Sequence, residues 1–201
     1  MSSVAALDAL AQRRVHIAGL HLAAANDPRA HDELVRLRCP GEDMQICSAV
    51  LWREGLVLRP GQPREISGTE DLVAMGARVV QRAPGSGAAR VWQRELDRLA
   101  VPGSAVSGPS AESHMDGARL VSWGLAEAAV VIEPIAEAFG LDFIPLAEER
   151  FELVYRSGDR DHAGVSAWMD LLASRRFDRE LRAMGAYDPA EAGNHRRVAA
   201  G

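Results

Sequence analysis

Apolar residues alternate between helical and strand-like spacing along most of the chain. In residues 3–12, Val4, Leu7 and Leu10 recur at helical spacing, whereas Val15–Leu22 is an apolar run typical of a buried strand. Predicted helices cover 3–12, 29–37, a short segment from Thr69, 89–100, 113–123, 134–139, 164–174 and 176–184. Predicted strands cover 15–22, 45–58 (as one strand or two), 77–81, 128–132, 142–146 and 150–155. Strands separated by helices predict an α/β fold with largely parallel sheets.

Composition is ordinary for a soluble globular protein. The chain has 201 residues, of which 47% are hydrophobic and 25% charged, enough for a full core. No apolar run is long enough to predict a membrane span, and the N-terminus has no pattern of a secretory signal. The two cysteines, Cys39 and Cys47, are too few for a disulfide framework or a zinc site. We therefore expect a cytoplasmic protein that has no contact with a membrane.

Charge excludes several classes of function. The net charge of −5 argues against a nucleic-acid surface over the whole chain. All 23 basic residues are arginine. The absence of lysine excludes Schiff-base catalysis and the lysine of a P-loop nucleotide site.

The segment Arg82–Arg90, with the sequence RAPGSGAAR, joins a predicted strand to a predicted helix through Gly-Ser-Gly. The first amide hydrogens of a helix have no intrahelical partner, and the helix dipole is positive at that end. Glycines also allow a ligand to approach the backbone closely, so this turn is a candidate anion site. The alternative is a plain turn in which Ser86 only caps the helix.

Four segments resemble one known family. His16–Leu22, then Arg82 with Gly85-Ser-Gly87, then Ser113-His114, then Gly140–Val154 occur in family order. They resemble the periplasmic-binding-protein-like domain of bacterial and archaeal regulators, which is also attached to some molybdopterin-biosynthesis proteins. The resemblance implies a type II periplasmic-binding fold, with two α/β lobes and the ligand in their cleft. Its stand-alone relatives bind molybdate or tungstate, so the implied ligand is an oxyanion of that kind. Lobe 1 is expected to comprise residues 1–76 plus 150–201, and lobe 2 residues 77–149.

The resemblance also implies a set of ligand-binding residues. They are Ser3, His21, Gly85, Ser86, Gly87, Ala88, Ser113 and His114. Serine hydroxyls and helix amides are neutral donors suited to an oxyanion. The family has threonine and arginine after its Gly-Ser-Gly, whereas Ala88 and Ala89 stand here. Simpler roles stay open: helix caps for Ser3, Ser86 and Ser113, a capping or packed residue for His114, and a core histidine for His21.

Catalytic and metal-binding alternatives fit the sequence poorly. Ser113, His114 and Asp116 are the residue types of a hydrolase triad, but neighbours in sequence do not converge on one reacting atom. The Glu148-Glu149 pair is interpreted as a solvated edge charge. His16 and His21, five positions apart on a strand, are expected on opposite faces. We expect no enzyme activity, no cofactor and no metal.

The sequence is thus interpreted as a small-ligand-binding domain for a molybdate- or tungstate-like oxyanion, acting as the sensor of a transcriptional regulator. DNA would be contacted only through a fused or separate helix-turn-helix, and a homodimer is possible. The alternative is an accessory domain in molybdenum-cofactor biosynthesis that binds a metal oxyanion or a pterin intermediate. In the resembling fold a buried strand precedes the first turn, and none is predicted before residue 3. Lobe 1 is therefore expected to lack its first strand here, and the native gene to encode more protein upstream.

Overall fold

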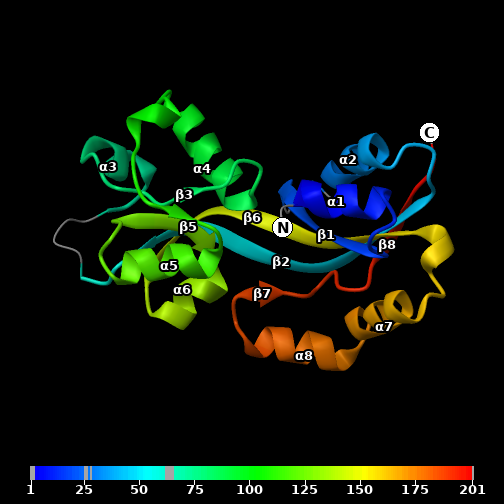
Figure 1. The fold of residues 1–201 in the computed structure, drawn as a ribbon. Coiled ribbons are helices and arrows are strands. Elements are labelled where there is room, and N and C mark those ends of the chain that lie inside the picture. Colours follow the sequence, from blue (N-terminus) through cyan, green and yellow to red (C-terminus); the bar gives the residue numbers. More distant parts are fainter. Residues whose placement is uncertain (1–2, 25–26, 28, 62–65, 201) are drawn as a thin grey trace. The chain divides into compact units, whose positions relative to one another are not determined.

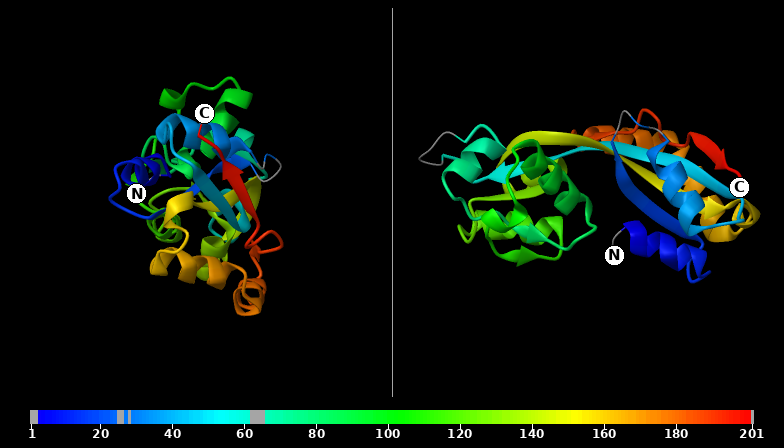
Figure 2. Two further views of the ribbon diagram at one scale, coloured as in Figure 1. Left: turned by 90° about the vertical axis from the view of Figure 1, so that its right-hand side faces the viewer. Right: turned by 90° about the horizontal axis from the view of Figure 1, so that it is seen from above.

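The computed structural model describes residues 3–24, 27, 29–61 and 66–200. The chain divides into two compact units: unit 1 is Met1–Trp52 with Glu148–Gly201, and unit 2 is Arg53–Ala147. Two long strands, β2 (Met44–Leu58) and β6 (Asp142–Arg156), carry the chain from one unit into the other (Figure 2). The main sheet has the order β1-β6-β2-β5, with β7 and β8 also paired to β2.

Unit 1 is a sheet covered by helices on both faces, with α1 and α2 on one face and α7 and α8 on the other (Figure 1). Its elements, besides parts of β2 and β6, are α1 (Ser3–Ala11), β1 (Ile17–Ala24), α2 (Ala30–Arg38), α7 (Ala163–Leu172), α8 (Arg175–Ala183), β7 (Tyr187–Asp188) and β8 (His195–Val198). Because strand side chains alternate between faces, Ile46 and Val154 pack towards α1 and α2, whereas neighbouring Cys47 and Tyr155 pack towards α7.

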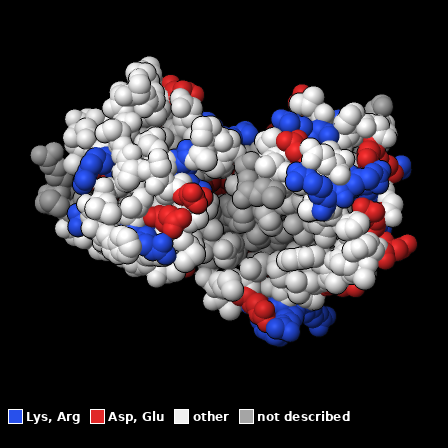
Figure 3. Space-filling view, in the orientation of Figure 1, with Lys and Arg blue, Asp and Glu red and all other residues white. Residues whose placement is uncertain are grey.

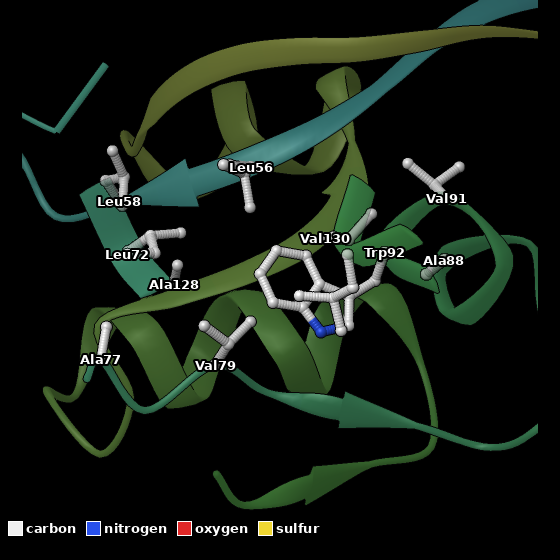
Figure 4. Packing of buried hydrophobic residues seen from close by; sticks show 11 residues of the cluster. Leu56, Leu58, Leu72, Ala77, Val79, Ala88, Val91, Trp92, Ala128 and Val130 are labelled. Carbon is white, nitrogen blue, oxygen red and sulfur yellow. The ribbon is translucent and has the colours of Figure 1, made fainter. Parts of the chain in front are cut away.

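Unit 2 is built in the same way, with α3 and α4 on one face of the sheet and α5 and α6 on the other (Figure 1). Its elements are α3 (Thr69–Ala74), β3 (Gln81–Arg82), α4 (Gly87–Arg98), β4 (Ser110–Ala111), α5 (His114–Ser122), β5 (Ala128–Ile132) and α6 (Glu133–Phe139). Leu56, Val130 and Trp92 belong to the core on the α4 side (Figure 4). Val57 and Val131 belong to the core on the α5 side.

All predicted helices are confirmed, with ends that differ by a few residues. The strands differ more. Residues 45–58 lie in the single strand β2, and the predicted strands 142–146 and 150–155 form one strand, β6. β6 crosses from unit 2 to unit 1 between Ala147 and Glu148. Its backbone stays extended there, but its residues are exposed or half-buried up to Glu148 and mostly buried after it. The predicted strand 77–81 is reduced to β3 at residues 81–82 and a bridge between Val79 and Ala128.

The expectation of largely parallel sheets is wrong. β1 with β6, and β2 with β5, β7 and β8, pair antiparallel, and only β3 with β4 and the Val79–Ala128 bridge are parallel in the described pairings. The sheet is organised around two long strands that lead into unit 2 and back, and not around βαβ units, which are what produce parallel pairing.

The two-unit organisation is present, with a first boundary that differs from the predicted one. The structure divides at Trp52/Arg53, whereas the sequence analysis placed the division at 76/77. The intervening residues pack with unit 2, because Leu56, Leu58 and Leu72 belong to its core.

The surface carries charge of both signs. Figure 3 shows arginine and carboxylate side chains mixed on the face in view, including over α8. In α8, Arg176 pairs with Glu180 and Arg182 with Asp178, each one helical turn apart. Within the described ranges, every helix is too short or too polar to span a lipid bilayer.

Candidate functional site

The Gly-Ser-Gly turn of unit 2 forms as the sequence predicts, between β3 and α4. Gly85 has a φ of +84°, a left-handed conformation that glycine adopts without strain. Ser86 is the N-cap of α4, and its Oγ accepts a hydrogen bond of 3.3 Å from the Ala89 amide. The capping role of Ser86 is therefore present in the structure.

This turn leaves two helix amides without acceptors. Ser86 Oγ serves Ala89, and the Ser86 carbonyl accepts from the Arg90 amide. The amides of Gly87 and Ala88 have no acceptor within the described part of the chain. Since α4 has 12 residues, its dipole adds partial positive charge at the same point. The turn can therefore donate to an anion.

A pocket of about 340 Å³ opens beside the turn. Its lining includes Arg82, Gly85, Ala88, Arg90, Trp92 and Val130, all from unit 2. Ser86 and Gly87 do not line it. Of the predicted site residues, Gly85 and Ala88 thus face this pocket, and Ser86 shapes the turn next to it.

Arg82 brings a half-buried positive charge to the pocket. Its Nη2 donates to the Glu112 carbonyl at 3.3 Å, while Nε and Nη1 are buried and have no hydrogen-bond partner among the described residues. Burial lowers the pKa of Arg82, and the carboxylates of Glu54 and Asp116 act in the opposite direction. An arginine stays protonated under such shifts, so the wall of the pocket contains a guanidinium cation.

Ser113 and His114 begin α5, as predicted. Ser113 Oγ accepts from the Asp116 amide at 3.1 Å and donates to Asp116 Oδ2 at 2.7 Å, so the helix cap occupies its hydroxyl. His114 Nε2 lies 3.9 Å from Oε1 of Glu54, which is fully buried. Neither Ser113 nor His114 lines the pocket. The carboxylate of Glu54, which lies near His114, also acts to raise the pKa of Arg82 against the effect of burial, and Arg82 does line the pocket.

Ser3 and His21 come together in unit 1. Ser3 is buried, and its Oγ accepts the His21 amide at 3.1 Å; Ser3 is the first residue of α1. His21 Nδ1 lies 3.6 Å from Oε2 of Glu149, and the His21 ring is 5.9 Å from that of Trp52. The hydroxyl oxygen of Ser3 thus ties the start of α1 to β1 at His21.

The interpretation of Glu148-Glu149 as a solvated edge charge is wrong for Glu149. Glu148 is exposed, but Glu149 is 4% exposed. It lies on β6 opposite Ala24 of β1, and its Oε2 faces the ring nitrogen Nδ1 of His21. In the described part of the chain, no three His, Cys, Asp or Glu side chains gather around a possible metal site.

Sequence reasoning missed Trp92 and Glu54 in unit 2. Trp92 lies in the buried stripe Ala88, Val91, Trp92 of α4, a pattern that could have predicted a core position facing the turn. Glu54 lies within the long strand β2, and its sequence gives no sign that His114 and Arg82 will lie near it.

Comparison with known proteins gives the family. The model of the PBP superfamily domain matches residues 1–173. Among curated proteins, the uncharacterized protein YvgK of Bacillus subtilis (strain 168) is 28% identical over 179 residues, which cover 88% of this chain and 58% of YvgK. The chain therefore spans a little over half the length of this relative.

Two solved structures show the same fold. PhnD1 from Prochlorococcus marinus (MIT 9301), in complex with methylphosphonate, matches with a TM-score of 0.60 and 14% identity, over 94% of this chain and 76% of that one. The CcmR regulatory domain of Synechocystis PCC6803, in complex with 2-PG, matches with a TM-score of 0.60 and 11% identity, over 85% of this chain and 77% of that one.

Proposed function

The chain belongs to the PBP superfamily domain family, and from that premise we propose that it is a ligand-binding sensor domain for a small oxyanion. Molybdate and tungstate are the first candidates, as the sequence resemblance implies. The domain binds and reports its ligand, and performs no catalysis.

The pocket beside α4 carries this proposal. Arg82 presents buried guanidinium nitrogens without partners, and the amides of Gly87 and Ala88 lie at the start of the same helix. Arg90 also lines the pocket and forms no ion pair with a described residue. Two arginines and a helix N-terminus favour an anion, although Glu54 and Asp116 offset part of the charge of Arg82.

These donors are sufficient for useful affinity. Hydrogen bonds to charged groups contribute about 1.5–3 kcal/mol each. Four or five of them, less the cost of ordering the ligand, are compatible with micromolar binding, which corresponds to about −8 kcal/mol.

The sensor role is supported by the likeness to a regulatory domain. The CcmR structure is of a regulatory domain with a small ligand bound, and this chain covers 77% of it. We propose that this chain acts in the same manner in a cytoplasmic regulator, with DNA contacted by a separate or fused helix-turn-helix.

Thermal unfolding with a panel of anions tests the proposal. An anion at 100 times its Kd adds about 2.7 kcal/mol, which for a chain of this length raises Tm by about 5–10 °C. We expect such a rise with molybdate, tungstate, phosphate or sulfate, and its loss in Arg82→Gln.

Arg78→Gln is the matched control, because Arg78 lies in the same unit, is paired with Glu127 and does not line the pocket. It should keep the rise in Tm. If none of the anions raises Tm at millimolar concentration, the proposed function is wrong.

A further inference from the structure

The pocket beside α4 has features that a bare oxyanion leaves unused. Resting on the proposed function, we infer that its ligand is an organic anion: a charged head group on Arg82 and the α4 N-terminus, joined to a largely apolar body that lies against Trp92 and carries one oxygen that accepts a hydrogen bond from the indole. Molybdate or tungstate would then occupy the head-group position only.

The size of the pocket is the first argument. Its volume is about 340 Å³. A single water accounts for about 30 Å³, and pockets for organic ligands span about 300–1,000 Å³. An ion with four oxygens fills only a small part of such a space. The remainder suits a carbon skeleton of about the size of one ring.

The walls are the second argument. Away from Arg82 and Arg90, the lining includes Val80, Ala88 and Val130, all buried, together with the Trp92 ring. Figure 4 shows the Trp92 ring beside Val130 in the core of unit 2. Water gains little at apolar walls, whereas an apolar ligand surface is favoured there by about 25 cal/mol per Å² buried. In this way the pocket combines one charged end with an apolar interior.

Trp92 supplies the third argument. The residue is 7% exposed, and its Nε1 is buried with no hydrogen-bond partner among the described residues. Buried tryptophan N–H groups normally find an acceptor, because an unsatisfied one is costly. Trp92 lines the pocket, and in the inferred complex its Nε1 turns towards the ligand, which supplies the missing acceptor. A hydroxyl, carbonyl or ether oxygen on the ligand body meets this need.

Matched pairs of ligands separate the head group from the body. Inorganic phosphate and phenylphosphonate share a phosphorus oxyanion and differ by one ring. Benzoate and the three hydroxybenzoates share a carboxylate and differ by one hydroxyl. By calorimetry on the full chain, we expect phenylphosphonate to bind at least tenfold more tightly than phosphate, and at least one hydroxybenzoate to bind several-fold more tightly than benzoate.

Trp92→Phe then tests the indole. It keeps an aromatic wall and removes the N–H donor. The hydroxybenzoate and benzoate should therefore bind this variant with about equal Kd values. Quenching of tryptophan fluorescence by phenylphosphonate should also disappear. Trp123→Phe is the control, because Trp123 lies in the same unit, is 67% exposed and is outside the pocket. It should retain both effects.

Ala89→Leu gives a second variant in case Trp92→Phe disturbs folding. Ala89 lines the pocket from α4, so the larger side chain should weaken phenylphosphonate at least tenfold more than it weakens phosphate. If phosphate binds as tightly as phenylphosphonate, with loss in Arg82→Gln, the organic-anion inference is wrong and the proposed function stands. If the hydroxybenzoate keeps its advantage in Trp92→Phe, the role of the indole is wrong. If none of these anions binds, the proposed function fails as well.

Discussion

Ser86 is at once a helix cap and a neighbour of the candidate pocket. Its Oγ accepts from the Ala89 amide, and its hydroxyl hydrogen has no acceptor in the described part of the chain. The two roles have different consequences on substitution, since a cap acts on the stability of the fold and a ligand donor acts on affinity.

Substitution of Ser86 by alanine and by glycine separates these roles. Ser→Ala at an N-cap costs about 0.5–2 kcal/mol, whereas Ser→Gly costs only a few tenths. We expect denaturant unfolding to rank stability as Ser86, then Ser86→Gly, then Ser86→Ala. If the hydroxyl also binds the anion, both variants lose affinity equally, by roughly tenfold. Full affinity in both variants would assign Ser86 to the cap alone.

Glu152 is a buried charge in unit 1 that depends on its partners. It is fully buried and accepts hydrogen bonds from Arg196 at 2.5 and 2.7 Å, from Ser48 at 3.1 Å, and lies 2.9 Å from His31 Nδ1. Burial raises the pKa of Glu152, but the hydrogen bonds from Arg196 and His31 outweigh it and lower the pKa from 4.5 to about 2.

This lowered pKa predicts an acid-sensitive fold. A carboxyl whose pKa is lower in the folded state stabilises fully above its unfolded value, 4.5, and loses that contribution as pH falls to about 2. The loss is about 3 kcal/mol, at 1.36 kcal/mol per pKa unit. Denaturant unfolding at pH 2–6 should show this fall, and Glu152→Gln should remove that part of it. Glu70→Gln, on an exposed carboxylate paired with Arg98, should change the pH profile much less, because solvent screens an exposed pair. A profile of Glu152→Gln identical to that of the unsubstituted protein would contradict the prediction.

At the scale of elements, strand β8 (His195–Val198) completes unit 1. It lies beyond residue 173, where the family match ends. Arg196 reaches Glu152 and Asp32, and Val198 is 1% exposed in the core with α1 and α2. The neighbouring Arg197 faces the other way and pairs with Asp43 in an exposed position.

Two adjacent arginines of β8 therefore offer a matched comparison. Arg196→Ala leaves the buried Glu152 charge without its main partner, which costs about 3–5 kcal/mol. Arg197→Ala removes only an exposed ion pair, and such pairs contribute little. Urea unfolding should show a large loss for the first variant and almost none for the second. Equal effects would mean that β8 does not hold Glu152 in the folded state.

The sequence predicts the elements better than it predicts their pairing. Helices α4 and α5 begin where a periodic run and a side-chain cap coincide, at Ser86 and Ser113, and these are local signals. The antiparallel sheet and the continuity of β6 depend on contacts between strands that are far apart in sequence. The local pattern of apolar and polar residues does not encode such contacts. The roles of Glu54 and Trp92 depend on the same long-range contacts, because neither residue differs in its local pattern from an ordinary strand or core position.

At the scale of the molecule, unit 2 contains everything that the candidate pocket needs. All residues that line the pocket lie within Arg53–Ala147. So do both apolar clusters that flank its sheet, on the α4 side and on the α5 side. The unit is also one continuous stretch of chain, whereas unit 1 is assembled from two.

The boundary of this unit is open to a direct test with two fragments, residues 53–147 and residues 77–149. The first keeps Leu56, Leu58 and Leu72, which are 0%, 5% and 1% exposed, and the pairing of Glu54–Leu58 with Ala128–Ile132. The second lacks all of these. Three buried leucines contribute roughly 5–9 kcal/mol, comparable with the whole stability of a domain, about 5–15 kcal/mol. We expect fragment 53–147 to show a cooperative thermal transition and phosphate binding that Arg82→Gln abolishes, and fragment 77–149 to show neither. A cooperative transition in 77–149 without one in 53–147 would instead place the boundary at 76/77, because the leucines of β2 and α3 would then be dispensable for this core.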